Sequence, residues 1–203
     1  MADSSFVPDG GAWEPWRPEI IRAALASVGV RWAIAAGWAI DLYLQKETRP
    51  HDDIEIAISH DSFEGIAACL KEVEWFAVGN GRAWPFADAP EGLHQTWGRD
   101  RADRRWRLDV FREPWNHDEW VFRRDPRIRR PLADAIEYSA DAIPFLAPEI
   151  VLLFKARSRQ RKDEADFEAT LPTLSLDRIE WLRGALETVH PSHPWATRLG
   201  TAF

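Results

Sequence analysis

Two neighbouring segments set the architecture of this chain: Ala36-Gly37-Trp38-Ala39-Ile40-Asp41-Leu42 and Arg49-Pro50-His51-Asp52-Asp53-Ile54-Glu55-Ile56-Ala57-Ile58. In the second segment, acidic and apolar residues alternate with a period of two from residue 53 to residue 56. Side chains two residues apart on a strand point to the same face. The pattern therefore predicts a strand over 53–58 with Asp53 and Glu55 on one face and Ile54 and Ile56 on the other.

Two carboxylates this close together repel, and each raises the pKa of the other. A divalent cation removes that conflict. Mg2+ in particular is held by one or two carboxylates together with the phosphates of a substrate. The spacing of Asp53 and Glu55 therefore predicts a magnesium site that also receives phosphate.

The glycine of the first segment supports the same interpretation. Residues 30–36 have the pattern of a buried strand, and residues 38–46 that of a helix. A glycine between the two lets the backbone approach a ligand closely. The first turn of a helix also has unpaired N–H groups that suit phosphate oxygens. We expect phosphate to bind at Gly37 and the start of the following helix.

With these residues the chain resembles the nucleotidyltransferase superfamily of the DNA polymerase beta type, and most of all its aminoglycoside and lincosamide nucleotidyltransferase-like branch. The resemblance implies an α/β (α+β) fold, with a small mixed sheet flanked by helices and a helical C-terminal part. It also implies Mg2+-dependent transfer of a nucleoside monophosphate from a nucleoside triphosphate, with ATP as the expected donor, to a hydroxyl group of an acceptor.

A third acid is expected on the later strand 105–112, where Asp109 stands between Leu108 and Val110. An acid in such a run is rarely buried without a partner. One interpretation is a solvent-facing position on an amphipathic strand. The other is a third carboxylate that joins Asp53 and Glu55 as metal ligand or general base, because the resembled family has an acid on a strand after the metal motif. We favour the second interpretation, with Glu113 as the fallback.

The resemblance also implies a set of nucleotide-binding residues: Ala36, Gly37, Trp38, His51, Lys155 and Lys162. The two lysines match helical lysines that lie near the triphosphate in related groups, although an exposed helix lysine usually has no specific role. His51 either contacts phosphate or anchors its loop by a hydrogen bond. Asp163 and Asp166 are expected to cap and pair locally.

Composition limits the alternatives. The chain has 203 residues and a net charge of −7, which disfavours nucleic acid as a partner and is compatible with a cationic small molecule. The arginine-rich runs 99–107 and 123–130 are interrupted by aspartates, so we interpret them as self-paired surface. No apolar run approaches the ~20 residues that span a bilayer, and no signal-peptide pattern precedes residue 18. A cytoplasmic location is the default expectation.

The chain divides into an irregular segment 1–17, a nucleotidyltransferase-like domain 18–140 and a helical part 141–203. The favoured function is transfer to a hydroxyl of a small molecule, such as an aminoglycoside-like antibiotic, with an acidic acceptor pocket beside the metal. A regulatory or toxin-like transferase acting on protein or RNA is an alternative. A non-catalytic nucleotide-binding relative is another, because Ala36 and Glu55 stand where the family usually has glycine and aspartate.

Overall fold

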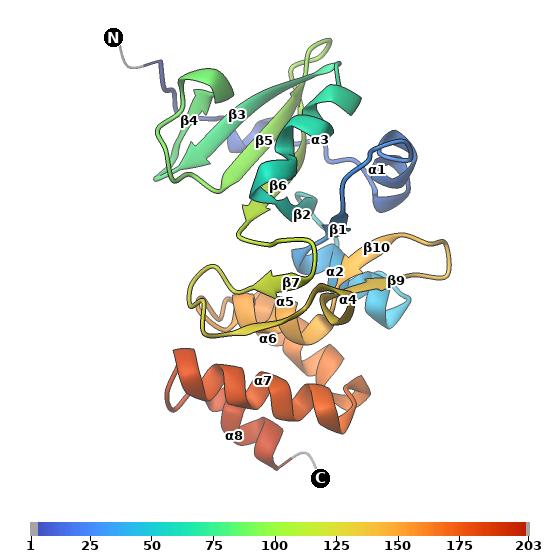
Figure 1. Cartoon of the computed structure of the whole chain (residues 1–203), viewed down its shortest axis with the longest axis vertical. Coiled ribbons are helices and arrows are strands. Elements are labelled where there is room, and N and C mark those ends of the chain that lie inside the picture. The colour runs from blue at the N-terminus through green and yellow to red at the C-terminus, as the bar shows by residue number, and fades with distance from the viewer. Residues whose placement is uncertain (1–3, 202–203) are drawn as a thin grey trace.

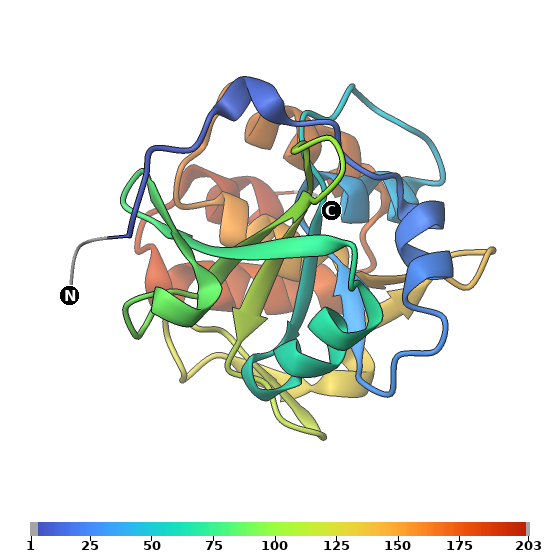
Figure 2. The same cartoon turned by 90° about the horizontal axis from the view of Figure 1, so that it is seen from above.

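The computed structural model describes residues 4–201, which contain an eight-stranded sheet and a two-stranded sheet (Figures 1 and 2). Residues 1–3 of the predicted N-terminal segment lie outside this range. The large sheet has the order β4 (Arg82–Pro85), β3 (Val73–Gly79), β5 (Gln95–Asp100), β6 (Trp106–Glu113), β2 (Glu55–Ser59), β1 (Trp32–Ile34), β10 (Pro144–Leu146), β9 (Ile136–Tyr138). The small sheet pairs β7 (Glu119–Val121) with β8 (Arg129–Pro131).

Within the large sheet, β2 runs parallel to β6 and β1 runs parallel to β10. The other neighbours are antiparallel. A parallel pair cannot be joined by a tight turn and needs a long crossover. Residues 60–105, which include β3, β4 and β5, form the crossover between β2 and β6. The two strands expected to carry the acids are thus direct neighbours.

The chain also forms eight α-helices within residues 4–201: α1 (Pro18–Ala24), α2 (Ala36–Leu44), α3 (Phe63–Cys69), α4 (Leu132–Ala135), α5 (Pro148–Lys155), α6 (Arg161–Thr170), α7 (Leu176–Val189) and α8 (Pro194–Gly200). Short 3-10 turns lie at Gly10–Ala12, His60–Ser62, Phe86–Asp88 and Leu171–Thr173. Helices α5 to α8 gather at the end of the molecule opposite β3, β4 and β5 (Figure 1).

The core joins the central strands to α5. Ile34 of β1, Ile56 of β2, Val110 of β6 and Ile150 of α5 are each 0% exposed and belong to one cluster. Pro148 stands in the first turn of α5, where a proline costs no helical hydrogen bond. The apolar run 150–153 that follows is buried throughout, so this helix is fixed against the sheet beside the pocket described below.

The predicted mixed sheet with flanking helices and a helical C-terminal part is confirmed. Two details differ from the prediction. Strand β2 begins at Glu55, so Asp53 lies in the segment just before the strand. Strand β4 was not predicted, and it follows a turn at residues 80–81. Asn80 and Gly81 have φ of 52° and 73°, as a two-residue hairpin turn requires, and this hairpin forms β4.

Strand β10 falls within the predicted helical part 141–203, yet it pairs with β1 in the sheet. The described part of the N-terminal segment is bound to the sheet: Phe6 bridges to Ala83 of β4, and Trp13 bridges to Trp106 of β6. None of the helices in residues 4–201 has the length and apolar character needed to cross a membrane. The cytoplasmic location stays a prediction.

Candidate active site

Two of the three predicted acids stand side by side on parallel strands. Glu55 of β2 is in register with Asp109 of β6, and the Asp109 N–H donates to the Ile54 carbonyl oxygen at 2.9 Å. Asp109 is 3% exposed, which rules out the solvent-facing interpretation of this position. Asp53 lies two residues before Glu55, close enough to raise the pKa values of both Glu55 and Asp109. The sheet therefore brings the predicted acids together.

Burial makes Asp109 and Glu55 reluctant to ionise. Burial first, and then the neighbouring charge of Asp53, raises the pKa of Asp109 from 3.8 to about 8, although a hydrogen bond from the Gln95 side-chain amide opposes the shift. Burial, together with the charges of Asp53 and Asp109, raises the pKa of Glu55 well above its usual range. Lys155 and Lys162 act in the opposite direction on Glu55.

The chemistry of these acids fits Mg2+. The side-chain oxygen Oδ1 of Asp109 is buried without a hydrogen-bond partner, and Glu55, Asp53 and Asp109 are hard oxygen donors whose mutual repulsion a cation would relieve. Within residues 4–201, however, no group of three or more His, Cys, Asp or Glu side chains is already arranged to hold a metal ion. The three acids thus have the oxygen ligands that Mg2+ prefers, but their side chains would have to move closer together to bind it.

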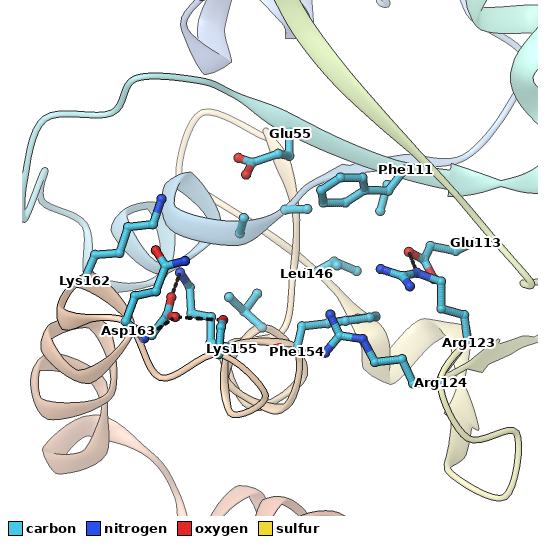
Figure 3. A pocket seen from close by; sticks show the side chains of 16 residues that line it. Glu55, Phe111, Glu113, Arg123, Arg124, Leu146, Phe154, Lys155, Lys162 and Asp163 are labelled. Atoms are coloured by element: carbon cyan, nitrogen blue, oxygen red, sulfur yellow. Dashed lines mark hydrogen bonds and ion pairs between the residues drawn. The ribbon is translucent and has the colours of Figure 1, made fainter. Parts of the chain in front are cut away.

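A pocket opens beside Glu55, between the sheet and helix α5 (Figure 3). Ala35 and Ala36 line it at the start of α2, and Ala57 and Phe111 form its floor on β2 and β6. Lys155 and Lys162 stand at one end, and Arg123 and Arg124 stand at the other. The acids are therefore flanked by lysines at the place where the helix presents its first N–H groups.

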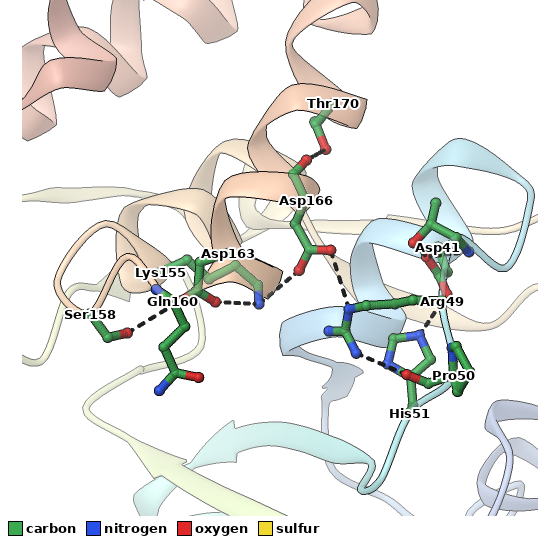
Figure 4. Close-up of polar contacts among 11 residues, drawn as sticks. Asp41, Arg49, Pro50, His51, Lys155, Ser158, Gln160, Asp163, Asp166 and Thr170 are labelled. Carbon is green, nitrogen blue, oxygen red and sulfur yellow. Dashed lines mark hydrogen bonds and ion pairs between the residues drawn. The ribbon is translucent and has the colours of Figure 1, made fainter.

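Lys155 is held in place by two buried carboxylates. Its Nζ lies 3.1 Å from Asp163 Oδ1 and 2.8 Å from Asp166 Oδ2, and Arg49 Nε approaches Asp166 from the other side at 3.5 Å (Figure 4). The other oxygen of Asp163 accepts from the Gln160 N–H and completes a capping box for α6. The predicted local capping and pairing agrees with the contacts of Asp163, whereas Asp166 also pairs with Arg49 from a distant segment. Lys162 lines the same end of the pocket and has no ion pair within the described chain.

Known proteins are similar to this chain in fold. Residues 19–82 match the family model of aminoglycoside-2''-adenylyltransferase. The crystal structure of ANT(2'')-Ia in complex with adenylyl-2''-tobramycin is similar, with a TM-score of 0.58 and 15% identity over 84% of this chain and 97% of that chain. The chain has a nucleotidyltransferase fold. The solution structure of the antibiotic-resistance factor ANT(2'')-Ia agrees, with a TM-score of 0.57 and 17% identity over 84% of this chain and 89% of that chain.

A third similar structure, of a second nucleotidyltransferase, is that of the lincosamide antibiotic adenylyltransferase LnuA with lincomycin bound. Its TM-score is 0.52, with 16% identity over 74% of this chain and 92% of that chain. A comparison with curated proteins found no match. The predicted resemblance to the aminoglycoside and lincosamide branch of nucleotidyltransferases is confirmed. The family model and the fold both match antibiotic adenylyltransferases, which are nucleotidyltransferase enzymes.

In this nucleotidyltransferase fold, His51 anchors its loop. Its Nε2 lies 2.6 Å from Asp41 Oδ2, both side chains are almost fully buried, and its ring stacks on Trp38 at 4.4 Å. Asp41 also accepts from the N–H and hydroxyl of Thr48. The contacts favour the loop-anchor interpretation of His51 over a phosphate contact. Trp38 is 8% exposed and supports this loop, so neither residue lines the pocket in Figure 3.

Gly37 provides room for that loop. A Cβ at this position would lie 2.7 Å from His51 Cε1 and 2.8 Å from His51 Nδ1, and it would also meet the Arg49 guanidinium. The close approach predicted for phosphate is thus occupied by side chains on this face of α2. Ala36, which lines the pocket, has φ of 49°, a left-handed value that costs an alanine more than a glycine. Ala36 is therefore the residue of this turn that lines the pocket, whereas Gly37 does not.

We expect Gly37→Ala to destabilise the protein by about 1–3 kcal/mol, because the added methyl group overpacks a ring held by Asp41 and Trp38. Thermal unfolding followed by circular dichroism measures the effect. Gly184→Ala is the matched control: Gly184 is exposed in α7, and a Cβ there meets nothing within 4 Å. That change should be neutral or stabilising by about 0.5–1 kcal/mol. Equal unfolding temperatures for the two variants would contradict the tight packing at Gly37.

Arg123 and Arg124 are the pocket residues that the sequence interpretation missed. The run 123–130 was expected to be self-paired surface, and this holds for Arg127, which pairs with Asp125, and for Arg129, which pairs with Glu119. It is wrong for the first two arginines, which line the pocket. One feature of the sequence distinguishes Arg123 and Arg124 from the later arginines of the run: they precede its first aspartate, Asp125. This end of the pocket, away from the acids, is lined by arginines, and the acidic acceptor pocket expected beside the metal stays a prediction.

Proposed function

We propose that the protein transfers a nucleoside monophosphate from a nucleoside triphosphate, with ATP as the first donor to test, to a hydroxyl of a small molecule in a Mg2+-dependent reaction. The observation that carries the proposal is the pairing of Glu55 with Asp109 beside a pocket that begins at α2. Aminoglycosides are the first acceptor class to test, because ANT(2'')-Ia has been crystallised with adenylyl-2''-tobramycin.

The chain's own residues have distinct parts in this reaction. Asp53, Glu55 and Asp109 would hold Mg2+, which would supply positive charge at the phosphates. The first N–H groups of α2 at Ala36, together with Lys155 and Lys162, would bind the triphosphate. Once ionised, Asp109 can also take the proton of the acceptor hydroxyl: its raised pKa makes the carboxylate a stronger base but keeps it largely protonated below about pH 8 unless a cation lies beside it.

The transfer itself is an in-line displacement at the α-phosphorus. The acceptor oxygen forms a bond to the α-phosphorus, and the bond from that phosphorus to the bridging oxygen of the β-phosphate breaks. Pyrophosphate leaves with the bonding electron pair, and the hydroxyl proton passes to the base. Preorganised positive charge near the phosphates stabilises the charge that develops, and this is usually the largest contribution to such catalysis.

The test is incubation of the whole protein with Mg2+ and each of the four ribonucleoside triphosphates against a panel of hydroxylated small molecules. Mass spectrometry of the products should show one acceptor gaining the mass of a nucleoside monophosphate, together with pyrophosphate. If only a protein or an RNA in a cell lysate gains a nucleotide, the regulatory transferase replaces this proposal. Binding of the triphosphate without any transfer would favour the non-catalytic relative.

We expect Lys155→Ala to weaken binding of Mg2+–ATP, because it removes the ammonium group that faces the pocket between Asp163 and Asp166. A charged hydrogen bond contributes about 1.5–3 kcal/mol, so affinity should fall roughly tenfold or more. Isothermal titration calorimetry measures it.

The control for this prediction is Lys71→Ala, because Lys71 is exposed and lies outside the pocket. Lys162→Ala is the second test variant, because Lys162 lines the pocket without an ion pair in the described residues and its loss leaves no buried carboxylate alone. Equal affinities for the Lys71 and Lys155 variants would return Lys155 to a purely structural role.

A further inference from the structure

The far end of the pocket has more positive than negative charge. Glu113, the carboxylate at this end, is buried and its Oε1 accepts from Arg123 Nε at 3.1 Å, while its buried Oε2 has no hydrogen-bond partner, so one carboxylate stands beside two arginines. Arg124 lines the same end, and within residues 4–201 it has no carboxylate at ion-pair distance. Its hydrogen bond goes to a neutral group instead: Nη1 donates to the Phe154 carbonyl oxygen at 2.8 Å. One guanidinium charge therefore remains available to a ligand.

The neighbouring groups agree with this charge. Partial burial, followed by the charges of Arg123 and Arg157, lowers the pKa of Arg124 to about 10. Burial, together with Arg123, Arg124 and Arg112, lowers the pKa of His94 to about 4, so this imidazole is neutral at pH 7. Neighbouring arginines thus lower the pKa values of both Arg124 and His94 beyond the effect of burial, and Glu113 only partly opposes this for Arg124, so an anion would relieve the concentration of cations here.

The space between the acids and the arginines is apolar. Ala57 and Phe111, which are paired on β2 and β6, form the floor, and Phe154 of α5 faces them (Figure 3). Asp109 and Glu113 are four residues apart on β6, which corresponds to roughly 13 Å along a strand. A molecule with a reactive hydroxyl at the acids could therefore place a flat ring over Phe111 and a second group at Arg124.

We infer that the acceptor of the transferred nucleotide carries an anionic group, a carboxylate or a phosphate, that binds at Arg123 and Arg124. This inference rests on the proposed function and names the class of its acceptor. The inferred acceptor differs from an aminoglycoside, the substrate class that the family match suggests. A polycation would be repelled by Arg124 at this end of the pocket, and the Glu113 carboxylate that could attract it already pairs with Arg123. In the reaction, the hydroxyl of that acceptor attacks the α-phosphorus and pyrophosphate leaves, while the anionic group only positions the molecule.

The experiment uses three glucosides that differ in one substituent of the aglycone: 4-carboxyphenyl, phenyl and 4-(aminomethyl)phenyl β-D-glucopyranoside. Each has a sugar with hydroxyl groups, a ring for Phe111 and a different charge at the far end. Calorimetry of the whole protein with Mg2+ and a non-hydrolysable ATP analogue measures the three affinities. We expect the carboxylate to bind roughly tenfold or more tightly than the neutral compound, and the amine more weakly than either.

Arg124→Gln should remove this preference and bring the carboxylate-to-neutral ratio near one. Arg127→Gln is the matched control, because Arg127 is 71% exposed and pairs with Asp125 outside the pocket. A second variant guards against misfolding: Arg123→Gln combined with Glu113→Gln removes the charged pair without leaving a lone buried carboxylate, and it should reduce the ratio as well.

The outcomes separate this inference from the proposed function. Equal affinities for the three glucosides, no detectable binding, or adenylylation of an aminoglycoside would overturn the anionic acceptor and leave nucleotidyl transfer intact. A fall in affinity for Mg2+–ATP in Arg124→Gln as large as in Lys155→Ala would also overturn it, because the arginines would then bind the triphosphate. Absence of Mg2+-dependent ATP binding in the wild-type protein would instead contradict the proposed function.

Discussion

Asp53→Ala should abolish Mg2+-dependent nucleotidyl transfer while the fold remains intact. Asp53 lies in the segment that enters β2, and its charge acts on both Glu55 and Asp109, so we group it with the acids of the proposed metal site. The segment itself is fixed by the backbone, because the carbonyl oxygen of the next residue accepts from the Asp109 N–H. Loss of the Asp53 side chain therefore removes a ligand without releasing the strand.

Calorimetry with Mg2+–ATP and a turnover assay measure the effect of Asp53→Ala, and circular dichroism checks the fold. Asp52→Ala is the matched control, since Asp52 is the adjacent acid, is exposed and lies outside the pocket. Asp52→Ala should have the same affinity for Mg2+–ATP and the same turnover rate as the wild-type protein. Unchanged affinity for Mg2+–ATP in Asp53→Ala would remove the main basis of the proposed metal site.

Asp109→Asn should reduce turnover by about 10²–10⁴-fold, which is the usual contribution of a general base. Asparagine keeps the size of the side chain and an oxygen for the Gln95 amide, but it cannot take a proton from the acceptor hydroxyl. If Asp109 acts mainly as the base, affinity for Mg2+–ATP should change less than turnover. If affinity for Mg2+–ATP falls as much as turnover, Asp109 acts mainly as a metal ligand instead. Unchanged turnover would exclude both roles.

Glu113→Gln is the comparison for Asp109→Asn, because Glu113 was the fallback for the third acid. Glu113 is paired with Arg123 at the other end of the pocket, so this change should spare the chemical step.

The pH dependence of the free energy of unfolding, measured without metal, tests the protonation of Asp109 in the folded protein. The raised pKa of Asp109 means that the unfolded chain binds fewer protons than the folded one, so wild-type stability falls as pH rises from 3.8 towards about 8. Asp109→Asn should lose this part of the pH dependence.

The acids could be predicted from the sequence because each depends on a local pattern. The period of two around Glu55 placed it opposite the buried isoleucines, and the isolated acid in the apolar run 108–110 identified Asp109. Their pairing across β2 and β6 needed the fold, because 46 residues of crossover separate the strands. The resemblance supplied this expectation.

Other parts of the site depend on contacts between distant segments, which local patterns do not encode. His51 bonds to Asp41 across a loop, and Lys155 meets Asp166, which itself meets Arg49 from far along the chain. Arg124 and Arg127 are both basic residues of one run, and only the tertiary structure distinguishes the pocket residue from the surface residue.

The bridge between Phe6 and Ala83 has a consequence for the behaviour of the protein in concentrated solution. Strand β4 is an edge of the large sheet, and an uncovered edge offers its free N–H and C=O groups to strands of other molecules. Here the Phe6 N–H donates to the Ala83 carbonyl oxygen at 2.9 Å, and the Ala83 N–H donates back at 2.8 Å. The N-terminal segment thus occupies a position where a second molecule could otherwise add a strand, and it protects this edge of the sheet against aggregation.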